Sequence, residues 1–372
     1  MFRHTRRLIG LVCLTTLMAL LALGGVSAQE ELIPVRLQLQ WVAQSQFAGY
    51  FAALDQGFYE EEGLDVTILE GAVEIVPQQV VVSGGAEFGI AWVPKVLDWR
   101  EEDTDLVNIA QVFQRSGTLE ISFVETGIES VEDFEGMTIG TWGFGNEHEL
   151  IAAIRAAGLD PDNPEEVDVF PNQPFDMSML LNGDLDAAQA MTYNEYAQVL
   201  EQVNPETGEL YQPEDLSVID FNDVGTAMLQ DHIFTTESWL AEEGNEEVAI
   251  KFLKASFKGW IFCRDNFDAC VDIVLDNGTT LGESHQQWQL NEINALIWPS
   301  PDGIGMLDQA LWDQTVAVAI EGNVIADEPT EGAYRTDLAQ AALEQLQEEN
   351  PDIDVTGEAW ERIEVELRPG GE

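Results

Sequence analysis

Hydrophobic periodicity constrains the fold of this chain more than any other feature of its sequence. Residues 35–41 alternate between apolar and polar side chains, and this period of two predicts a β-strand. Residues 47–54 carry apolar side chains at helical spacing, followed by Gly57 as a helix C-cap, and residues 64–68 alternate again. The stretch therefore predicts a βαβ unit with parallel strands and a right-handed crossover.

The same alternation of strand and helix continues along the chain. Further strands are expected at 86–92, 106–112, 131–142 and 183–193, with helices at 74–83, 94–102 and 147–157 between them. This order predicts an α/β fold with helices packed on a largely parallel sheet. From residue 237 onward the signals are mostly helical, and the last twenty or so residues resemble a tail. A length of 372 residues favours two lobes or domains over one core.

Residues 1–28 have the composition of a secretory signal peptide. Three arginines precede the apolar stretch 8–23, and small residues at 26–28 form a cleavage site. The apolar stretch is shorter than the ~20 residues that a membrane span requires. We therefore expect an exported protein, in the periplasm or on the outer face of the cell envelope, with no membrane span after cleavage following Ala28.

The chain is strongly acidic, with a formal net charge of −54 from 69 Asp and Glu residues against 15 Lys and Arg residues. The acids are scattered along the sequence and do not form one tail. This balance excludes nucleic acid and anionic lipid as partners that bind through a basic patch. It predicts a heavily solvated, acidic surface.

Two cysteines follow the signal segment, Cys263 and Cys270. On one continuous helix they would lie about 10.5 Å apart, too far for a disulfide. The intervening RDNFD could instead turn the chain between two helices, and an oxidising compartment then favours a structural disulfide. Free buried thiols are the alternative, and a metal site is disfavoured because no histidine is close in sequence.

Aromatic residues stand at the carboxyl ends of four predicted strands. Ligands of open α/β sheets bind at this edge, so the four side chains predict an aromatic-walled cleft, with packing at the rim as the alternative for each one. Amide and carboxylate side chains nearby suit a planar, hydrogen-bonding heterocycle, whereas a sulfonate or phosphate would require cations of which the sequence shows few. The aromatic residues are Trp41, Trp92, Trp142 and Tyr193, and the polar residues are Gln44, Gln46, Gln114, Asn146, Asn194 and Glu195.

Catalytic motifs are weak in this sequence. His148, His232 and His285 are isolated, the HEL at 148–150 lacks the second histidine of a zinc-protease helix, and neither a nucleophile elbow nor a dinucleotide fingerprint occurs. Glu195 could serve as a general acid or base, but a carboxylate that binds a ligand is the simpler interpretation. We expect no enzymatic activity, no catalytic residue, no metal and no cofactor.

Several motifs, in order, resemble a known family. The segment LQLQWVAQSQFAGYFAALDQGFYEEEGLDVTILEG resembles the opening of periplasmic solute-binding proteins of ABC importers, in the thiamine-pyrimidine-precursor branch related to nitrate, taurine and alkanesulfonate binders. VVSGGAEFGIAW, GMTIGTWGFGNEHEL and LLNGDLDAAQAMTYNEYA continue the likeness. The resemblance implies a type II periplasmic-binding fold of two α/β lobes that close on a ligand by a hinge. It also implies an ABC permease and its ATPase as partners of a monomeric binding protein.

By this resemblance the lobes have definite boundaries. Lobe 1 would comprise 31–118 and 231–345, lobe 2 would comprise 119–230, and 346–372 would be a C-terminal extension. SGTLEISF and GTAMLQDHIF would cross between the lobes. The ligand would lie between walls formed by Trp41, Gln44, Phe47, Tyr50 and Trp92 on one side and by Trp142, Gly143, Asn146, Tyr193, Asn194 and Glu195 on the other, with Gln114 and Asp231 as further candidates.

The resemblance leaves the ligand and one enzymatic relative open. A hydroxymethylpyrimidine-type thiamine precursor is the default ligand, and riboflavin is the alternative because the many tryptophans suit a larger ring. Fungal thiamine pyrimidine synthases, which use pyridoxal phosphate and iron, also resemble these binders. They carry a lysine and a histidine where this chain has Ala91 and Lys95, and their cysteine-rich run is absent here, so we disfavour a synthase.

Overall fold

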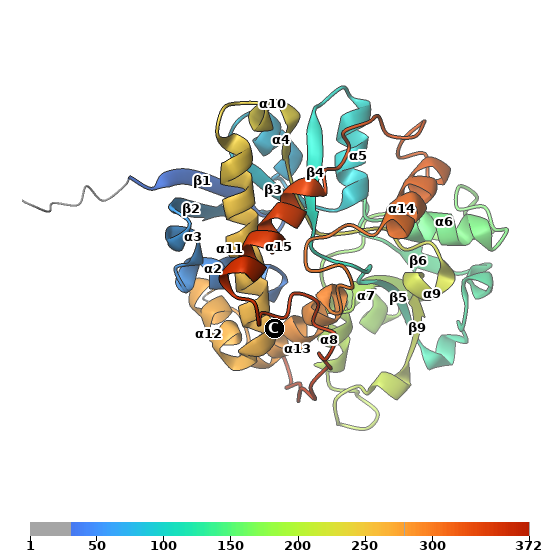
Figure 1. Ribbon diagram of the computed structural model, residues 1–372. Helices are drawn as coiled ribbons and strands as arrows, with labels where there is room; N and C mark the ends of the chain where they lie inside the picture. Colours follow the sequence, from blue (N-terminus) through green and yellow to red (C-terminus); the bar gives the residue numbers. More distant parts are fainter. Residues whose placement is uncertain (1–30, 279, 372) are drawn as a thin grey trace, which may run out of the picture. The chain divides into compact units, whose positions relative to one another are not determined.

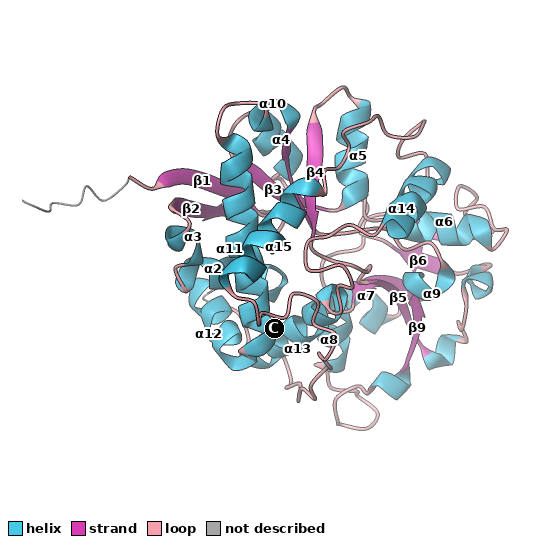
Figure 2. Ribbon diagram, in the orientation of Figure 1, coloured by secondary structure: helices cyan, strands magenta, loops and turns pink. Residues whose placement is uncertain are grey.

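The computed structural model describes residues 31–278 and 280–371 (Figure 1). The predicted signal peptide lies outside the described residues, and its prediction stands on the sequence alone. The compact unit that begins at Pro34 contains two five-stranded sheets with helices packed on them, as Figure 2 shows. The α/β class predicted from the periodicity is therefore confirmed.

The first sheet combines strands that are far apart in sequence. Its order is β2-β1-β3-β10-β4; β1 runs parallel to β3, whereas β10 is antiparallel to both β3 and β4. The last described strand in sequence thus lies inside a sheet otherwise made from the first third of the chain. The bounds are β1 Ile33–Gln38, β2 Leu64–Leu69, β3 Phe88–Ala91, β4 Leu106–Gln111 and β10 His232–Thr236.

The second sheet repeats this arrangement with strands from the middle of the chain. Its order is β7-β6-β8-β5-β9; β6 is parallel to β7 and β8, and β5 is antiparallel to β8 and β9. The bounds are β5 Thr118–Phe123, β6 Thr138–Gly140, β7 Asp168–Phe170, β8 Ala187–Met191 and β9 Leu216–Asp220. Each sheet is mixed by one strand: β1, β3 and β4 run in one direction against β10, and β6, β7, β8 and β9 run in one direction against β5, so the expectation of a largely parallel sheet missed these antiparallel members. The antiparallel members β5 and β10 are the strands that the chain forms directly after crossing from one sheet to the other.

Helices cover the sheets and supply most of the chain after β10. Helix α6 begins at His148 and ends at Ala156, close to the predicted range, and α15 ends at Glu349 before Asn350 and Pro351. The helices that precede β10 are α2 Ala48–Asp55, α3 Phe58–Glu61, α4 Pro77–Val82, α5 Val93–Glu101, α6 His148–Ala156, α7 Ser178–Asn182, α8 Glu195–Leu200 and α9 Phe221–Val224. Those that follow β10 are α10 Glu237–Leu240, α11 Asn245–Asp265, α12 Phe267–Asn277, α13 Glu283–Ile297, α14 Gln309–Glu321 and α15 Asp337–Glu349.

The close packing of α2 on α11 depends on two glycines. A Cβ added at Gly259 would overlap the carbonyl oxygen of Gly49, and one added at Gly49 would overlap the Trp260 ring. Tyr50 packs edge-on against the same ring, with centroids 5.5 Å apart. Because these side chains are almost completely buried, the contact belongs to the main hydrophobic core.

The two segments that cross between the sheets run side by side and are joined by hydrogen bonds. The Phe113 amide donates to the Asp231 carbonyl (3.0 Å), and the Gly117 amide donates to Gln230 Oε1 (2.8 Å). Glu149 on α6 accepts from the Ser116 hydroxyl at 3.0 Å and from the Met228 amide, so one buried carboxyl contacts both segments. The lobe boundaries near 118 and 230 stay a prediction.

The turn between α11 and α12 brings the two cysteines together. Helix α11 ends at Asp265, Asn266 leaves the helical region with φ −133° and ψ 58°, and α12 begins at Phe267. Cys263 and Cys270 are joined by a disulfide with a Cα–Cα distance of 5.0 Å. The alternative of free thiols is therefore not what the structure shows.

The first strand is shorter than predicted. We expected it to reach Trp41, but β1 ends at Gln38, where its pairing with Gly89 of β3 ends. Beyond that point the Leu39 amide donates to the Leu69 carbonyl and the Gly71 amide donates to the Trp41 carbonyl, but the chain bends from Gln40 onward and forms no ladder. Trp41 thus lies in the loop that follows the strand.

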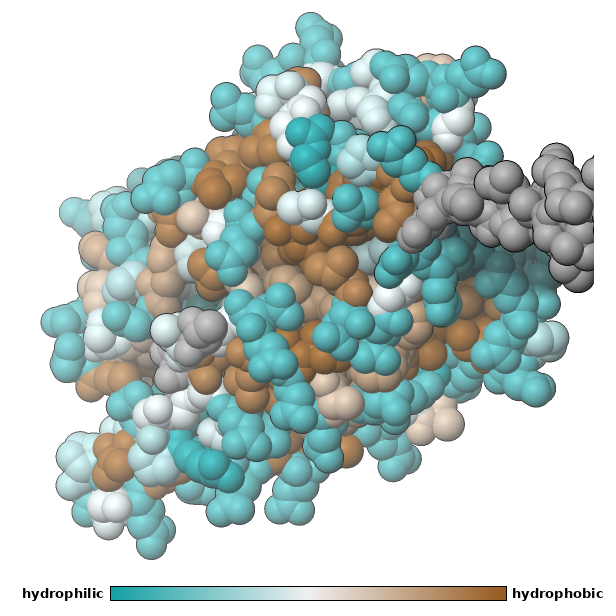
Figure 3. All heavy atoms as spheres, turned by 90° about the vertical axis from the view of Figure 1, so that its left-hand side faces the viewer, coloured by the Kyte–Doolittle hydropathy of each residue, from teal (hydrophilic) through white to brown (hydrophobic). Residues whose placement is uncertain are grey.

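The C-terminal residues pack on the body instead of leaving it. Described residues 350–371 form neither helix nor strand, yet Arg362 forms an ion pair with Glu292 at 2.9 Å and the Ile363 amide donates to Asn291 at 3.0 Å. Both partners lie on α13. Figure 3 shows one face of the molecule, where hydrophilic side chains surround patches of apolar ones, in keeping with the acidic composition. Among the described helices, none is long and apolar enough to cross a membrane.

Candidate functional site

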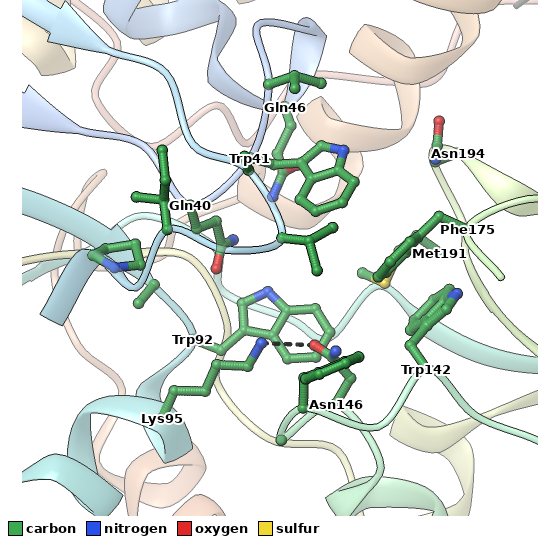
Figure 4. Close-up of a pocket in the computed structure, with 18 of the residues that line it drawn as sticks. Gln40, Trp41, Gln46, Trp92, Lys95, Trp142, Asn146, Phe175, Met191 and Asn194 are labelled. Atoms are coloured by element: carbon green, nitrogen blue, oxygen red, sulfur yellow. Dashed lines mark hydrogen bonds between the residues drawn. The ribbon is translucent and has the colours of Figure 1, made fainter. Parts of the chain in front are cut away.

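A cavity of about 670 Å³ lies at the carboxyl ends of parallel strands from both sheets. Most of its lining comes from the segments that follow β1, β2, β3, β6, β7 and β8, which is the edge where α/β sheets usually bind ligands, and α13 adds His285 and Gln286. Figure 4 shows Gln40, Trp41, Gln46 and Trp92 on one side and Phe175, Met191 and Trp142 on the other. Volumes of 300–1,000 Å³ are typical of small-molecule sites.

Aromatic rings form much of the cavity wall. The Trp41 and Phe175 rings have centroids 4.9 Å apart, and Phe175 is nearly parallel to Trp142, with an angle of 14° and a centroid distance of 6.4 Å. Trp92 follows β3 directly, and Tyr193 lies two residues after β8. These rings offer flat apolar faces of the kind that stack on planar ligands.

Lys95 brings a cation into the cavity. Its Nζ donates to Asn146 Oδ1 at 2.8 Å and lies 4.9 Å from the centroid of the Trp92 ring. Burial lowers the pKa of Lys95 to about 8, although the nearby carboxylates of Glu147 and Asp231 act in the opposite direction. We predicted few cations at the site from the sequence and so missed Lys95, which lies in the first turn of α5 and points toward Asn146 in the loop after β6.

Asp231 lies behind the cavity wall and holds two of the lining amides. Its Oδ1 accepts from Gln40 Nε2 at 2.6 Å, and its Oδ2 accepts from Gln46 Nε2 at 2.9 Å. Burial raises the pKa of Asp231 to about 7, while hydrogen bonds from Gln46, Gln40 and Trp92 and the charge of Lys95 oppose that rise. Gln46 Oε1 in turn accepts from Gln44 Nε2 at 2.8 Å.

A second polar group lies beside α13. His285 Nε2 is 2.9 Å from Asn194 Oδ1, and its Nδ1 is 3.1 Å from Glu201 Oε2. Glu195 accepts from the Met191 amide at 3.0 Å and from Asn194 Nδ2 at 2.9 Å, and burial raises its pKa. Because both carboxylate oxygens of Glu195 are already hydrogen-bonded, its first role is to order the loop before α8.

The structure brings nine of the predicted site residues to the cavity and keeps five away from its lining. Phe47 and Tyr50 belong to the hydrophobic core, Gln114 donates to the carbonyls of Gln111 and Met306, Gly143 packs against the Pro171 carbonyl, and Asp231 lies behind the glutamines. The family resemblance implied that Phe47 and Tyr50 contact the ligand, but both side chains are buried in the core instead. The nine at the cavity are Trp41, Gln44, Gln46, Trp92, Trp142, Asn146, Tyr193, Asn194 and Glu195.

Sequence reasoning also missed several lining residues. Phe175 lies in the loop after β7, and Gln40 precedes the tryptophan that drew attention to this region. His148 and His285 were noted only as isolated histidines, yet both line the cavity. Strand-end position could have indicated Phe175, whereas nothing in the sequence pattern marks His285. Within the described ranges, no group of three or more His, Cys, Asp or Glu side chains is placed to hold a metal ion.

Comparison with known proteins decides the family. The profile of the family described as NMT1/THI5 like matches residues 44–269, more than half of the chain. The chain belongs to the NMT1/THI5-like family. This family member shares 25% identity over 273 residues with the formylaminopyrimidine-binding protein of Halalkalibacterium halodurans, covering 73% of this chain and 78% of that protein.

Two further comparisons extend this assignment. The NMT1/THI5-like chain is also 25% identical over 299 residues to the riboflavin-binding protein RibY of Chloroflexus aurantiacus, covering 78% of this chain and 81% of that protein. Its fold is similar to that of the putative periplasmic sulfonate-binding protein SsuA of Methylobacillus flagellatus, with a TM-score of 0.61, 16% identity and coverage of 91% and 99%. The NMT1/THI5-like chain thus has the periplasmic-binding-protein fold expected from its motifs.

Proposed function

We propose that this protein is the exported substrate-binding component of an ABC importer and that it captures a planar heterocycle between its two sheets. The observation that carries the proposal is the aromatic wall formed by Trp41, Trp92, Trp142 and Phe175, with side-chain amides beside it. A ligand ring that stacks on such faces gains contact area, and side-chain amides can form hydrogen bonds with polar atoms at its edge. The permease and its ATPase are the partners that this role requires.

Within this proposal, a hydroxymethylpyrimidine-type thiamine precursor is the first candidate ligand. Support comes from the relative named for formylaminopyrimidine binding and from the size of the site, which easily admits a single substituted ring. Riboflavin is the second candidate, because a cavity of about 670 Å³ walled by several aromatic rings also suits a three-ring system. A relative named for riboflavin binding aligns over a similar length.

Calorimetric titration tests the proposal directly. The purified mature protein is titrated with 4-amino-5-hydroxymethyl-2-methylpyrimidine and, separately, with riboflavin, and we expect saturable binding of one ligand per chain by at least one of them. Taurine and nitrate serve as controls of another chemical class and are expected to give no heat. Absence of binding by both heterocycles, with binding of either control, would reject the heterocycle proposal.

A synthase remains the alternative of another class. Lys95 is a buried lysine with a lowered pKa, the kind of group that can form a covalent bond with a cofactor aldehyde, but its Nζ is hydrogen-bonded to Asn146. A binding role requires no turnover. One experiment distinguishes a binding protein from a synthase. The protein is incubated with pyridoxal phosphate and ferrous iron, and a pyrimidine product is sought by mass spectrometry. Product formation would overturn the binding proposal.

A further inference from the structure

The carboxylate of Asp231 determines how three neighbouring side chains face the cavity. It is 2% exposed and accepts hydrogen bonds from Gln40 Nε2 (2.6 Å) and Gln46 Nε2 (2.9 Å), with the Trp92 indole as a third donor. Gln40, Gln46 and Trp92 all line the cavity, whereas Asp231 does not. Asp231 is therefore a group behind the wall that acts through residues in it.

An ionised carboxylate accepts hydrogen bonds and cannot donate them. A glutamine amide has a donor end and an acceptor end, so an amide that donates to Asp231 must turn its carbonyl oxygen elsewhere. For Gln46, the carbonyl accepts from Gln44 Nε2 at 2.8 Å, and this bond fixes the orientation of Gln44 in the same way. Asp231 thus fixes the orientation of the Gln46 amide directly and that of the Gln44 amide indirectly, through Gln46.

Two side-chain carbonyl oxygens of these glutamines have no hydrogen-bond donor among the described residues. Within the described residues, neither Gln40 Oε1 nor Gln44 Oε1 receives a hydrogen bond from another side chain or from the backbone, and both glutamines line the cavity. Figure 4 shows the Gln40 side chain close to Trp41 and Trp92, with its oxygen on the side of Trp92 and Lys95. This part of the wall therefore presents two carbonyl acceptors, while each amide NH₂ group keeps one N–H besides the one that it donates within the wall.

We infer that Asp231 is a positioning residue that makes this wall selective for a heterocycle carrying N–H donors on the edge that faces Gln40 and Gln44. The inference rests on the proposed function and narrows its substrate class to rings with an exocyclic amine or an imide N–H. A ring that presents only acceptors or methyl groups to this wall would leave the two carbonyls unsatisfied, which costs binding free energy. The 4-aminopyrimidines and the N3–H edge of a flavin both supply the required donor.

Two matched ligand pairs test the inference by calorimetry at about pH 8. One pair is 4-amino-5-hydroxymethyl-2-methylpyrimidine and its analogue with a methyl group in place of the 4-amino group. The other is riboflavin and 3-methylriboflavin. For the pair that binds, we expect the donor-bearing member to bind at least about tenfold more tightly to the natural protein. Which pair binds distinguishes the two candidate ligands.

The variant Asp231→Asn supplies the decisive comparison. Asparagine has one acceptor oxygen for three donors, and its own amide donates, so at least one glutamine is expected to reverse and present its NH₂ group to the cavity. The preference for the donor-bearing ligand should then fall at least about threefold, with the affinity for the methyl analogue changed less than about twofold. Asp105→Asn, which makes the same change at a carboxylate that accepts from the Ser238 amide outside the cavity, should leave the preference unchanged.

A second variant tests the inference even if Asp231→Asn does not fold. Gln40→Met removes the terminal acceptor at a partly exposed position and keeps a similar shape, so it should lower the preference without Asp231 being altered. Equal weakening of both members of a pair in Asp231→Asn would indicate a merely structural role and overturn the inference, as would equal affinity of the natural protein for both members. Failure to bind all four compounds would instead reject the proposed function, and the inference with it.

Discussion

At the scale of single residues, the aromatic rings of the cavity wall should dominate ligand affinity. Trp142 is nearly parallel to Phe175 across a 6.4 Å centroid distance, so the pair offers a stacking surface. We predict that Trp142→Leu weakens binding of whichever heterocycle the protein captures by about 1–2 kcal/mol, roughly tenfold in Kd. Calorimetric titration measures the change.

The matched control for this prediction is Trp360→Leu. Trp360 packs against the main core and does not line the cavity, so its replacement should leave Kd within about twofold. Equal affinities for Trp142→Leu and the unaltered protein would show that this ring is part of the packing only.

Lys95 should give the protein a measurable pH dependence of stability. Burial lowers its pKa to about 8 from an unfolded value of 10.5, so between these values the unfolded chain binds more protons than the folded one. The free energy of unfolding should therefore rise as the pH increases from about 8 to about 10.5, because the folded protein no longer buries a charge. Urea unfolding at pH 7, 8.5 and 10 measures this rise.

The variant Lys95→Met isolates this contribution. It should be more stable than the unaltered protein at pH 7, because an apolar chain replaces a desolvated ammonium group, and the stability difference should shrink toward pH 10. A difference that stays constant across this range would contradict the lowered pKa. Lys251→Met, at a half-exposed lysine paired with Glu247, is the control.

At the scale of elements, the contact between α2 and α11 requires a glycine. A Cβ at Gly259 would overlap the Gly49 carbonyl oxygen, a backbone atom that cannot move aside alone. We predict that Gly259→Ala lowers the free energy of unfolding by about 1–3 kcal/mol, despite the higher helix propensity of alanine. Gly322→Ala at the end of α14, where the nearest atom would be 3.1 Å from the new Cβ, should cost much less. Thermal melting compares the two variants.

The disulfide between α11 and α12 should stabilise the corner that these helices form. It closes a short loop, with a sequence separation of 7, so the chain-entropy model gives about 2–3 kcal/mol. The double variant Cys263→Ser, Cys270→Ser should unfold at a correspondingly lower urea concentration. Addition of dithiothreitol should destabilise the natural protein but leave the double variant unchanged, and equal responses would contradict a stabilising role.

The helices and strands also show how much of the fold the sequence alone predicts. Periodicity identified the α/β class and the helix that begins near Glu147, because these depend on local spacing, whereas the break between Cys263 and Cys270 was one of two alternatives that the sequence left open. It placed the end of the first strand at Trp41 instead of Gln38, since the strand ends where its partner β3 no longer pairs with it. The bond from Gln40 to Asp231 joins residues 191 positions apart, and no local pattern encodes such a contact.

At the scale of the whole molecule, net charge should set the salt response. With 69 acidic against 15 basic residues, repulsion among surface carboxylates opposes the compact state, and added salt screens it. We predict that Tm rises by several degrees between about 20 mM and 500 mM NaCl at pH 7.5. Differential scanning calorimetry measures the shift, and a Tm that falls with salt would show that ion pairs outweigh the repulsion.

The placement of β10 restricts how this protein could be divided. A fragment that ends after β4 would lack β10, leaving β3 and β4 without the strand that lies between them. The second sheet is built from one contiguous segment instead, because β5 to β9 follow one another between residues 118 and 220. The half of the binding cavity that the first sheet contributes is therefore not a contiguous gene segment, and recombination between relatives at one crossover point after β4 would combine β10 of one parent with β1 to β4 of the other.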